Sequence, residues 1–581
     1  MKPRPPHRPS APVSKAPPPL KEDDLRIIPL GGVEEIGKNM TVIEIGPDII
    51  IVDIGLAFPT DDAPGVDYII PDVTYLEQNK SRVRGVIITH GHLDHTGGIP
   101  YIMNRIGNPP LYTRNLTSLF VKKRMDEFPH LPPLNIIVVE NDTRVKMGQI
   151  PVRFFGVTHT IPDSMGVIVE TSYGLIVTPG DFKLDLTAVD GDPTPEEEVT
   201  YKIFDKEKTL LLLSDSTNIE NPGFSVPERE TNKNLEEIIK NIKGRLFIGT
   251  FASQLERMIK IIGVAEKYGR KLIVEGRSMK TNIEVATQAG MLKVKKDTFI
   301  PATEIDNYPD DKVVILATGA QGEEFAALMR MANKTHKNLK FKKGDTVLLS
   351  SSIIPGNEIT VQKLKDNIAR QGAKIISYRT SEVYIHSSGH GNRGEIEWLH
   401  RKIKPKFFIP IHGSHHKLRL HEDLALELGM PEKNIVVPDN GMIIEIQDKG
   451  KKIVALKETA SSKVIMVDGI GSDNVQEVVI RDRQMLATDG MFVIVILIDT
   501  KTGKVRKSPD ILSRGFVYLK ESQELLRNVR ILTKKKIEEA TTRMHPINFD
   551  YVKNIVREEI GRYLFQKTHK RPIILPVLIE V

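Results

Sequence analysis

The sequence predicts a multidomain α/β protein in which a layered, metal-binding α/β sandwich is interrupted by a second α/β domain. Three observations support this prediction. The 581 residues exceed what a single hydrophobic core normally supports. Several apolar strands end on histidine or aspartate, and the last of these residues, His412, lies 231 residues after Asp181. A loop cannot fill such a gap, and the segment has strands and helices of its own, so we expect it to be an inserted domain.

The first strand end is the most informative. Val86–Thr89 has the apolar character of a buried strand, and the loop His90-Gly91-His92-Leu93-Asp94-His95 follows it. Imidazole nitrogen and carboxylate oxygen are ligands for zinc and neighbouring transition ions. One tight loop can present His90 and His92 to one ion while Asp94 and His95 face a second. Histidines that cap helices or pair in a core are the alternative, but four ligand-type residues in six positions favour two adjacent metal ions.

Four further strands end on residues of the same kind, namely Asp53, His159, Asp181 and His412. Asp53 is expected to orient a histidine ligand rather than to bind an ion, because metal-bound imidazoles usually need a carboxylate or carbonyl on their other nitrogen. His159 or Asp181 alone would be an ordinary strand-end or turn residue. Their order after the His90–His95 loop is what makes both candidate ligands.

The composition narrows the function classes. The sequence has no cysteine, which excludes disulfides, thiolate metal sites and cysteine nucleophiles and is consistent with a cytoplasmic location. The net charge of +7 is a weak indication of an anionic partner. The longest apolar runs are too short to span a bilayer, so no membrane association is expected. Residues 1–24 are rich in proline and basic residues without an apolar core, and we expect a disordered basic tail there.

These residues and several longer segments carry a family resemblance. The ordered series of strand-end ligands resembles the metallo-β-lactamase fold in its β-CASP nucleic-acid-processing branch, and more closely the bacterial ribonuclease J family. The resemblance covers all but about the first 24 residues. Its supporting segments are Pro29–Gly37, Pro179–Lys183, Ser214–Asn218, Thr318–Glu323, Ile354–Glu358, Ser388–Gly391 and Ile573–Val577.

The resemblance implies a metallo-β-lactamase αββα sandwich with an inserted β-CASP α/β domain and a small C-terminal α/β domain. In the C-terminal domain, strands are predicted at Val478–Arg481, Met491–Asp499 and Ile573–Ile579, and helices at Ser522–His545 and Asp550–Lys567. The expected boundaries are the tail over 1–24, the metallo-β-lactamase domain over 25–218 and 378–446, the β-CASP domain over 219–377, a linker over 447–463 and the C-terminal domain over 464–581.

The family pattern also implies the ligand sets. It places His90, His92 and His159 on one ion, Asp94, His95 and His412 on the other, and Asp181 between them. Two zinc ions per subunit are expected, and manganese accepts the same groups. The resemblance further suggests a structural cation such as calcium at Asp67 and Asp468, although two solvated turn aspartates are the alternative.

The resemblance implies roles for a second group of residues. A hydroxide activated by two metal ions would attack the phosphodiester, and His390, tuned by Asp215, would protonate the leaving oxygen. The turn that contains His390 is expected to bind the substrate, through residues His386, Ser387, Ser388, Gly389 and His390. Taken alone, a histidine in such a turn is equally often structural.

The resemblance implies a metal-dependent ribonuclease that acts on single-stranded RNA in mRNA decay and rRNA maturation. It is expected to be a 5′-to-3′ exonuclease that favours 5′-monophosphate ends, and also an endonuclease. Self-association as a dimer or tetramer through the C-terminal domain, and RNA-degradation or ribosome-associated partners, are expected as well. Two alternatives remain open: another hydrolase on the same fold, such as a lactonase or thioesterase, and an inactive paralogue that scaffolds an active one.

Overall fold

The computed structural model describes residues 18–581 apart from 22, 60–62, 187–195, 470–476, 518–521, 543 and 545. Most of the predicted basic tail, residues 1–17 and 22, therefore lies outside the described residues. The chain divides into two compact units. The larger contains the segment that ends at Ala57 together with Ile70–Val464, and the smaller contains Phe58–Ile69 and Ile465–Val581.

Two β-sheets in the larger unit share one hydrophobic core. Ile27, Ile50 and Ile444 of the eight-stranded sheet pack with Phe154 and Leu211 of the six-stranded sheet. The eight-stranded sheet has the order β20 (Lys452–Thr459), β19 (Met442–Gln447), β1 (Leu25–Gly31), β2 (Met40–Ile45), β3 (Asp48–Val52), β5 (Val83–Ile87), β6 (Leu111–Thr113) and β7 (Ile136–Val138). The six-stranded sheet has the order β18 (Phe407–Ile411), β12 (Thr209–Asp215), β11 (Gly174–Thr178), β10 (Ser164–Thr171), β9 (Ile150–Val157) and β8 (Arg144–Met147).

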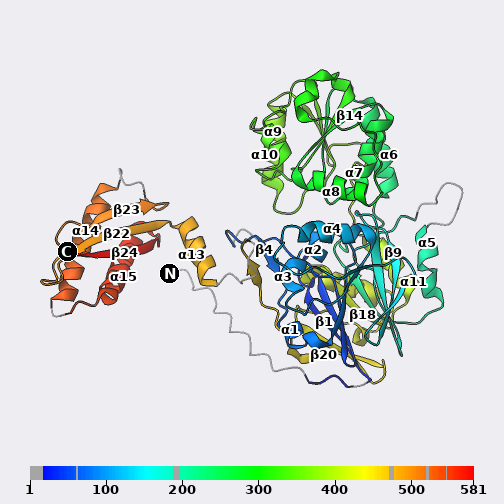
Figure 1. The fold of residues 1–581 in the computed structure, drawn as a ribbon, viewed down its shortest axis with the longest axis horizontal. Helices are drawn as coiled ribbons and strands as arrows, with labels where there is room; N and C mark the ends of the chain where they lie inside the picture. Colours follow the sequence, from blue (N-terminus) through cyan, green and yellow to red (C-terminus); the bar gives the residue numbers. More distant parts are fainter. Residues whose placement is uncertain are drawn as a thin grey trace. The chain divides into compact units, whose positions relative to one another are not determined.

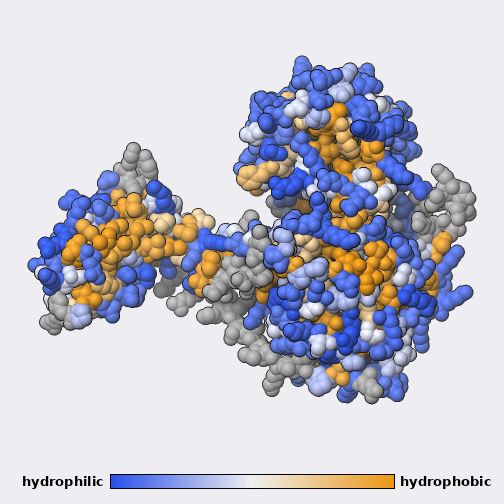
Figure 2. All heavy atoms as spheres, in the orientation of Figure 1, coloured by the Kyte–Doolittle hydropathy of each residue, from blue (hydrophilic) through white to orange (hydrophobic). Residues whose placement is uncertain are grey.

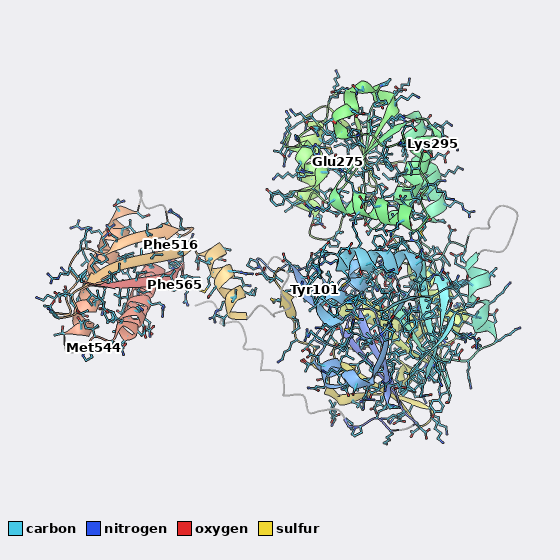
Figure 3. The ribbon with its side chains drawn as sticks, viewed as in Figure 1. Tyr101, Glu275, Lys295, Phe516, Met544 and Phe565 are labelled. Atoms are coloured by element: carbon cyan, nitrogen blue, oxygen red, sulfur yellow. The ribbon has the colours of Figure 1, made fainter. Side chains whose placement is uncertain are left out.

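Helices cover the outer faces of both sheets, which gives the αββα layers (Figure 1). On the six-stranded sheet, Phe408 packs with Ile396 of α11 (Arg393–Ile403) and Leu424 of α12 (His415–Glu427). Tyr101 of α3, labelled in Figure 3, packs edge-on against Phe128 with ring centroids 5.4 Å apart. The helices beside the eight-stranded sheet are α1 (Thr74–Gln78), α2 (Leu93–Thr96), α3 (Ile99–Ile102) and α4 (Asn115–Met125).

The segment between β12 and β18 contains a third sheet, in which all neighbouring strands are parallel. Its order is β14 (Lys271–Glu275), β15 (Val313–Ala317), β13 (Leu246–Gly249), β16 (Thr346–Leu349) and β17 (Lys374–Ser377). Parallel strands are buried on both faces, and two separate cores flank this sheet. One side is covered by α6 (Glu228–Asn241), α7 (Leu255–Lys267) and α8 (Arg277–Gln288), and the other by α9 (Ala327–Ala332) and α10 (Glu358–Ala369).

The smaller unit has a three-stranded sheet of order β23 (Asp510–Arg514), β22 (Met491–Ile498) and β24 (Ile573–Glu580). Alternate residues of β22, such as Phe492 and Ile494, pack against α14 (Gln523–Thr541) and α15 (Phe549–Thr568). Phe516, labelled in Figure 3, lies edge-on to Phe492 with ring centroids 5.8 Å apart. Two short strands, β4 (Tyr68–Ile70) and β21 (Ile465–Val467), form a separate two-stranded sheet. Helix α13 (Glu477–Thr488) follows β21 in the chain.

Two expectations about local structure are wrong. The run Val478–Arg481 was predicted as a strand, but it forms part of helix α13. Val478 and Val479 are 54% and 40% exposed, whereas Ile480 is 5% exposed, so the run contributes one buried side chain to a helix. The segment 447–463, predicted as a linker from its polar residues, contains strand β20, which pairs antiparallel with β19. An edge strand with one solvated face accounts for that polarity.

Within the described parts of the chain, no helix combines the length and apolar character needed to cross a bilayer.

Candidate metal centre

The predicted ligands converge at the ends of strands from both sheets of the sandwich. His90 and His92 lie in the loop after β5, and Asp94 and His95 lie in the short helix α2 that follows it. The ends of β9, β11 and β18 supply His159, Asp181 and His412. All seven side chains that were expected to bind metal belong to two clusters of ligand atoms, which share Asp181. Within each cluster the ligand atoms lie within 4.8 Å of one another.

The first cluster consists of His90, His92, His159 and Asp181. The Nδ1 atom of His92 lies 3.1 Å from Nε2 of His90 and 3.2 Å from Nε2 of His159. Oδ2 of Asp181 lies 3.7 Å from Nε2 of His90 and 3.8 Å from Nε2 of His159. Three imidazole nitrogens and one carboxylate oxygen therefore face a common point, and this donor set fits a tetrahedral transition ion.

The second cluster consists of Asp94, His95, His412 and the same Asp181. Oδ2 of Asp94 lies 3.5 Å from Nε2 of His95 and 3.3 Å from Nε2 of His412. The Asp181 carboxylate extends between the clusters, because its Oδ2 also lies 3.3 Å from Nε2 of His95. Each cluster could hold one metal ion, and a bridging carboxylate suits a pair of adjacent ions.

The outward-facing nitrogens of the histidines have partners that fix their orientation. Nδ1 of His95 lies 2.7 Å from Oδ2 of Asp53, the contact that the sequence predicts for this aspartate. Nδ1 of His159 lies 2.7 Å from the Gly389 carbonyl, and Nε2 of His92 lies 3.2 Å from the Ser253 carbonyl. Such partners set the tautomer and direction of a ligand histidine.

The backbone is strained at two points of the centre. Asp53 and His412 have φ values of 64° and 53°, in the left-handed region that side chains other than glycine seldom adopt. The N–H of Asp53 donates to the Ile87 carbonyl at 2.8 Å, and that of His412 donates to the Gly32 carbonyl at 2.6 Å. These bonds hold both residues in place, a pattern that is typical of functional sites.

His390 and Asp215 form a pair beside the second cluster. Nδ1 of His390 lies 2.6 Å from Oδ2 of Asp215, and its Nε2 lies 3.8 Å from Oδ2 of Asp181. Burial opposes protonation, but the carboxylates of Asp215 and Asp181 outweigh it and raise the pKa of His390. The structure thus brings the predicted pair together and turns the free nitrogen of its imidazole toward Asp181.

The loop His386–His390 is held by donors from several elements. Nζ of Lys183 donates to Ser387 Oγ at 3.1 Å and to the Ser388 carbonyl at 3.3 Å. Nδ2 of Asn218 donates to Ser388 Oγ at 2.9 Å and to the His390 carbonyl at 3.0 Å. The loop therefore has a fixed conformation next to the metal ligands.

Sequence reasoning missed several of the residues that support the centre. The side-chain nitrogen Nδ2 of Asn39 lies 3.1 Å from Nε2 of His95, and Thr217 Oγ1 lies 2.9 Å from Nδ1 of His412. Lys183 and Thr217 stand in the segments Pro179–Lys183 and Ser214–Asn218, whose match to the family pattern could have marked them. Asn39 has no comparable signal.

The proposed cation site at Asp67 and Asp468 has other partners. The Asp67 carboxylate accepts a hydrogen bond of 2.7 Å from the Gly469 N–H, and Asp468 forms an ion pair with Arg483. Neither aspartate belongs to a metal-ligating cluster among the residues that the structure describes.

The chain matches four family models, which together cover most of its length. They are the metallo-β-lactamase superfamily over residues 34–214, the ribonuclease J β-CASP domain over 243–368, the Zn-dependent metallo-hydrolase RNA specificity domain over 379–438 and the ribonuclease J C-terminal domain over 478–581. Ribonuclease J 2 of Staphylococcus aureus (strain NCTC 8325 / PS 47) is 36% identical over 97% of this chain and 99% of its own length. The chain belongs to the ribonuclease J family.

Ribonuclease J 2 of Staphylococcus epidermidis (strain ATCC 12228 / FDA PCI 1200) has the same identity and coverage. A solved structure of a protein of unknown function from Enterococcus faecalis V583 matches with a TM-score of 0.51 and 16% identity, over 73% of this chain and 100% of that one. At that identity the likeness concerns the fold alone.

Membership of the ribonuclease J family confirms the predicted fold class and the family resemblance. The protein is a hydrolase of the metallo-β-lactamase and β-CASP type, and a nuclease. The superfamily implies metal ions, and the RNA specificity domain implies RNA binding.

Proposed function

We propose that this protein hydrolyses phosphodiester bonds of single-stranded RNA, as a 5′-to-3′ exonuclease that favours 5′-monophosphate ends and as an endonuclease. The observation that carries the proposal is the pair of ligand clusters that share Asp181, with His390 directed at the same carboxylate. Two ions bound there would activate a water molecule and neutralise charge on the scissile phosphate.

His390 supplies the proton that the leaving oxygen needs. Asp215 holds its Nδ1, so the Nε2–H is left to face the reacting phosphate. The same carboxylate stabilises the protonated imidazole, since it raises the pKa of His390. A general acid held in this way donates a proton from one nitrogen without changing its orientation.

Single-stranded RNA fits the surroundings of the centre better than a duplex. The inserted domain contacts the metal ligands directly, because the Ser253 carbonyl at the start of α7 lies 3.2 Å from Nε2 of His92. A substrate must therefore reach the ligands beside this contact. The polar loop His386–His390 borders the same space and is the proposed site of contact with the RNA backbone.

Zinc is the proposed metal, two ions per subunit, with manganese as the alternative. The donors in both clusters are imidazole nitrogens and carboxylate oxygens, which both metals accept. Purified protein stripped with a chelator and reconstituted with either metal would distinguish them. Activity restored by manganese alone would contradict the zinc assignment.

Self-association through the C-terminal domain is proposed from its outer sheet face. Leu512, Leu575, Val577 and Ile579 on the side of the sheet away from α14 and α15 are 41–54% exposed. Figure 2 shows hydrophobic residues gathered over these strands. Exposed apolar patches of this kind mark interaction surfaces, and a dimer or tetramer would cover this one.

The cellular role is proposed as mRNA decay and rRNA maturation in the cytoplasm, with RNA-degradation or ribosome-associated partners. The ribonuclease J relatives and the cysteine-free sequence support this assignment. Lactonase or thioesterase activity is not favoured, because the chain matches the RNA specificity and β-CASP models. An inactive scaffold is not favoured either, because every predicted ligand position holds a histidine or aspartate.

A time course on 5′-labelled RNA tests the proposal. Immediate release of labelled mononucleotide from a 5′-monophosphate, with slower release from a 5′-triphosphate, is expected. Thioester and lactone substrates serve as controls. Cleavage of these esters without cleavage of RNA would overturn the proposed function.

A further inference from the structure

A fully buried arginine of the inserted domain connects that domain to the loop His386–His390. Arg257, on the first turn of α7, has a relative exposure of 0%. Its guanidinium forms a two-pronged pair with Glu228, with Nε and Nη2 each 2.8 Å from a carboxylate oxygen. Glu228 is the first residue of α6, so this pair also joins the two helices.

The remaining N–H groups of Arg257 point at the loop His386–His390 and at Ser350, which directly follows strand β16. Nη1 lies 2.8 Å from Nδ1 of His386 and 3.4 Å from the Ser350 carbonyl, and Nη2 lies 3.1 Å from the Ser387 carbonyl. Together with the two bonds to Glu228, these contacts occupy all of the donors that a guanidinium has. A lysine cannot replace this pattern, because its ammonium carries fewer donors on a single atom.

The contact with Arg257 fixes the protonation of His386. A guanidinium only donates, so Nδ1 of His386 must accept and carry no proton. Burial, followed by the positive charges of Arg257 and Lys183, lowers the pKa of His386 to about 3. The imidazole is therefore neutral and has its proton on Nε2.

The loop is held from two sides. Arg257 of the inserted domain binds its first two residues, and Lys183 of the metallo-β-lactamase domain binds Ser387 and Ser388. Both cations also lie beside Glu228, since Nζ of Lys183 is 3.6 Å from its carboxylate. His390, at the end of the loop, takes its position relative to Asp181 from this framework.

We propose that Arg257 is a positioning residue for RNA cleavage, through which the inserted domain sets the conformation of the His386–His390 loop and thereby the aim of His390. This inference rests on the proposed ribonuclease function. Removal of the Arg257 side chain should lower kcat by at least about tenfold, because small displacements of reacting groups cost one to two orders of magnitude in rate.

The chain offers a matched control in the same domain. Arg245 is also buried and forms a two-pronged pair with Asp345, with Nε and Nη2 at 2.8 and 2.6 Å from its oxygens. Arg245 precedes β13 and Arg257 follows it, so the two arginines lie at opposite ends of that strand. Because the hydrogen bonds of Arg245 are with Asp345 and the Lys340 carbonyl, its removal should cost a similar buried ion pair without touching the loop His386–His390.

The experiment compares Arg257→Ala, Arg257→Lys and Arg245→Ala in the full-length, metal-loaded protein. Cleavage of 5′-monophosphorylated RNA, metal content and thermal unfolding are measured for each. We expect a selective loss of kcat in both Arg257 variants with unchanged metal content. Millimolar guanidinium should restore part of the activity of Arg257→Ala and none to Arg245→Ala. Wild-type kcat in Arg257→Lys, or an equal loss of kcat in Arg245→Ala, would overturn the proposal.

A spectroscopic measurement tests the same contact without catalysis. With ¹⁵N-labelled histidine, and His386→Gln to assign the signal, Nδ1 of His386 should report an unprotonated, hydrogen-bonded nitrogen. In Arg257→Lys that signal should shift. An unchanged signal would overturn the proposed positioning role. Failure of the wild-type protein to cleave any RNA would instead contradict the proposed function itself.

Discussion

Asp215 and His390 are 175 residues apart in the sequence, and yet Oδ2 of Asp215 lies 2.6 Å from Nδ1 of His390. Asp215 ends a strand of the metallo-β-lactamase sandwich, whereas His390 lies in the loop that follows the inserted domain. Their contact leaves Nε2 of His390 turned toward Asp181.

Replacing His390 with alanine should lower kcat by about 10²- to 10⁴-fold, which is the usual contribution of a general acid. RNA with a sulfur leaving atom at the scissile bond should be cleaved by His390→Ala at close to the wild-type rate, because a thiolate leaves without a proton. Asp215→Asn should show the same pattern more weakly. An equal defect on both substrates would argue against the acid role.

Replacing the shared carboxylate should affect both metal ions. In Asp181→Asn, elemental analysis should show the loss of both ions, because Asp181 belongs to both clusters. His159→Ala should lose one ion, since His159 belongs to the first cluster and not to the second. The same stoichiometry in the two variants would contradict a bridging role for Asp181.

Asp53→Asn should weaken metal binding about 10- to 100-fold without unfolding the protein. Asparagine tolerates the left-handed backbone that Asp53 adopts at a φ of 64°. It removes the charge that faces Nδ1 of His95, 2.7 Å away. Metal titration of the chelator-stripped protein measures the effect, and unaltered affinity would show that Asp53 only shapes the backbone.

Stability should depend on pH through Glu256. Burial and the neighbouring carboxylate of Glu228 raise the pKa of Glu256 from 4.5 to about 7. Between these values the folded protein keeps a proton that the unfolded chain has released, so this group makes the folded state less stable as pH rises toward 7. Glu256→Gln should therefore stabilise the fold by up to about 3 kcal/mol above pH 7.

Thermal unfolding at pH 5 and pH 8 measures this effect. The gain in Tm of Glu256→Gln over the wild type should be larger at pH 8. Glu284→Gln is the control, because its side chain is 69% exposed. Equal gains at both pH values for Glu256→Gln would refute the assignment.

A charge on the outer sheet face of the C-terminal domain should weaken self-association. Val577→Lys changes a residue on the exposed face of β24, and a dissociation constant raised by at least about tenfold is expected in analytical ultracentrifugation. Ile531→Lys is the control, because Ile531 lies on α14, on the other side of the sheet, and is 58% exposed. Weakening by both variants alike would point to a different surface.

Much of the centre could be predicted because its ligands are concentrated in short segments. The loop His90–His95 places four donors directly after one strand, and that spacing is visible without any tertiary contact. The position of Asp53 at a strand end predicts that it contacts a histidine ligand. It does not predict which histidine. The prediction of a strand at Val478–Arg481 failed because a run of only three apolar residues does not distinguish a strand from a helix.

The chemistry of this protein can be read from its amino-acid order: histidine and aspartate donors at strand ends, no thiols, and an insertion before the last ligand. Tertiary structure alone decided which atoms meet. Asn39 beside His95, Thr217 beside His412, and Arg257 with Glu228 and His386 are separated by up to 195 residues along the chain. Such contacts leave no local pattern, because they depend on how two sheets and an inserted domain pack rather than on the spacing of neighbouring residues.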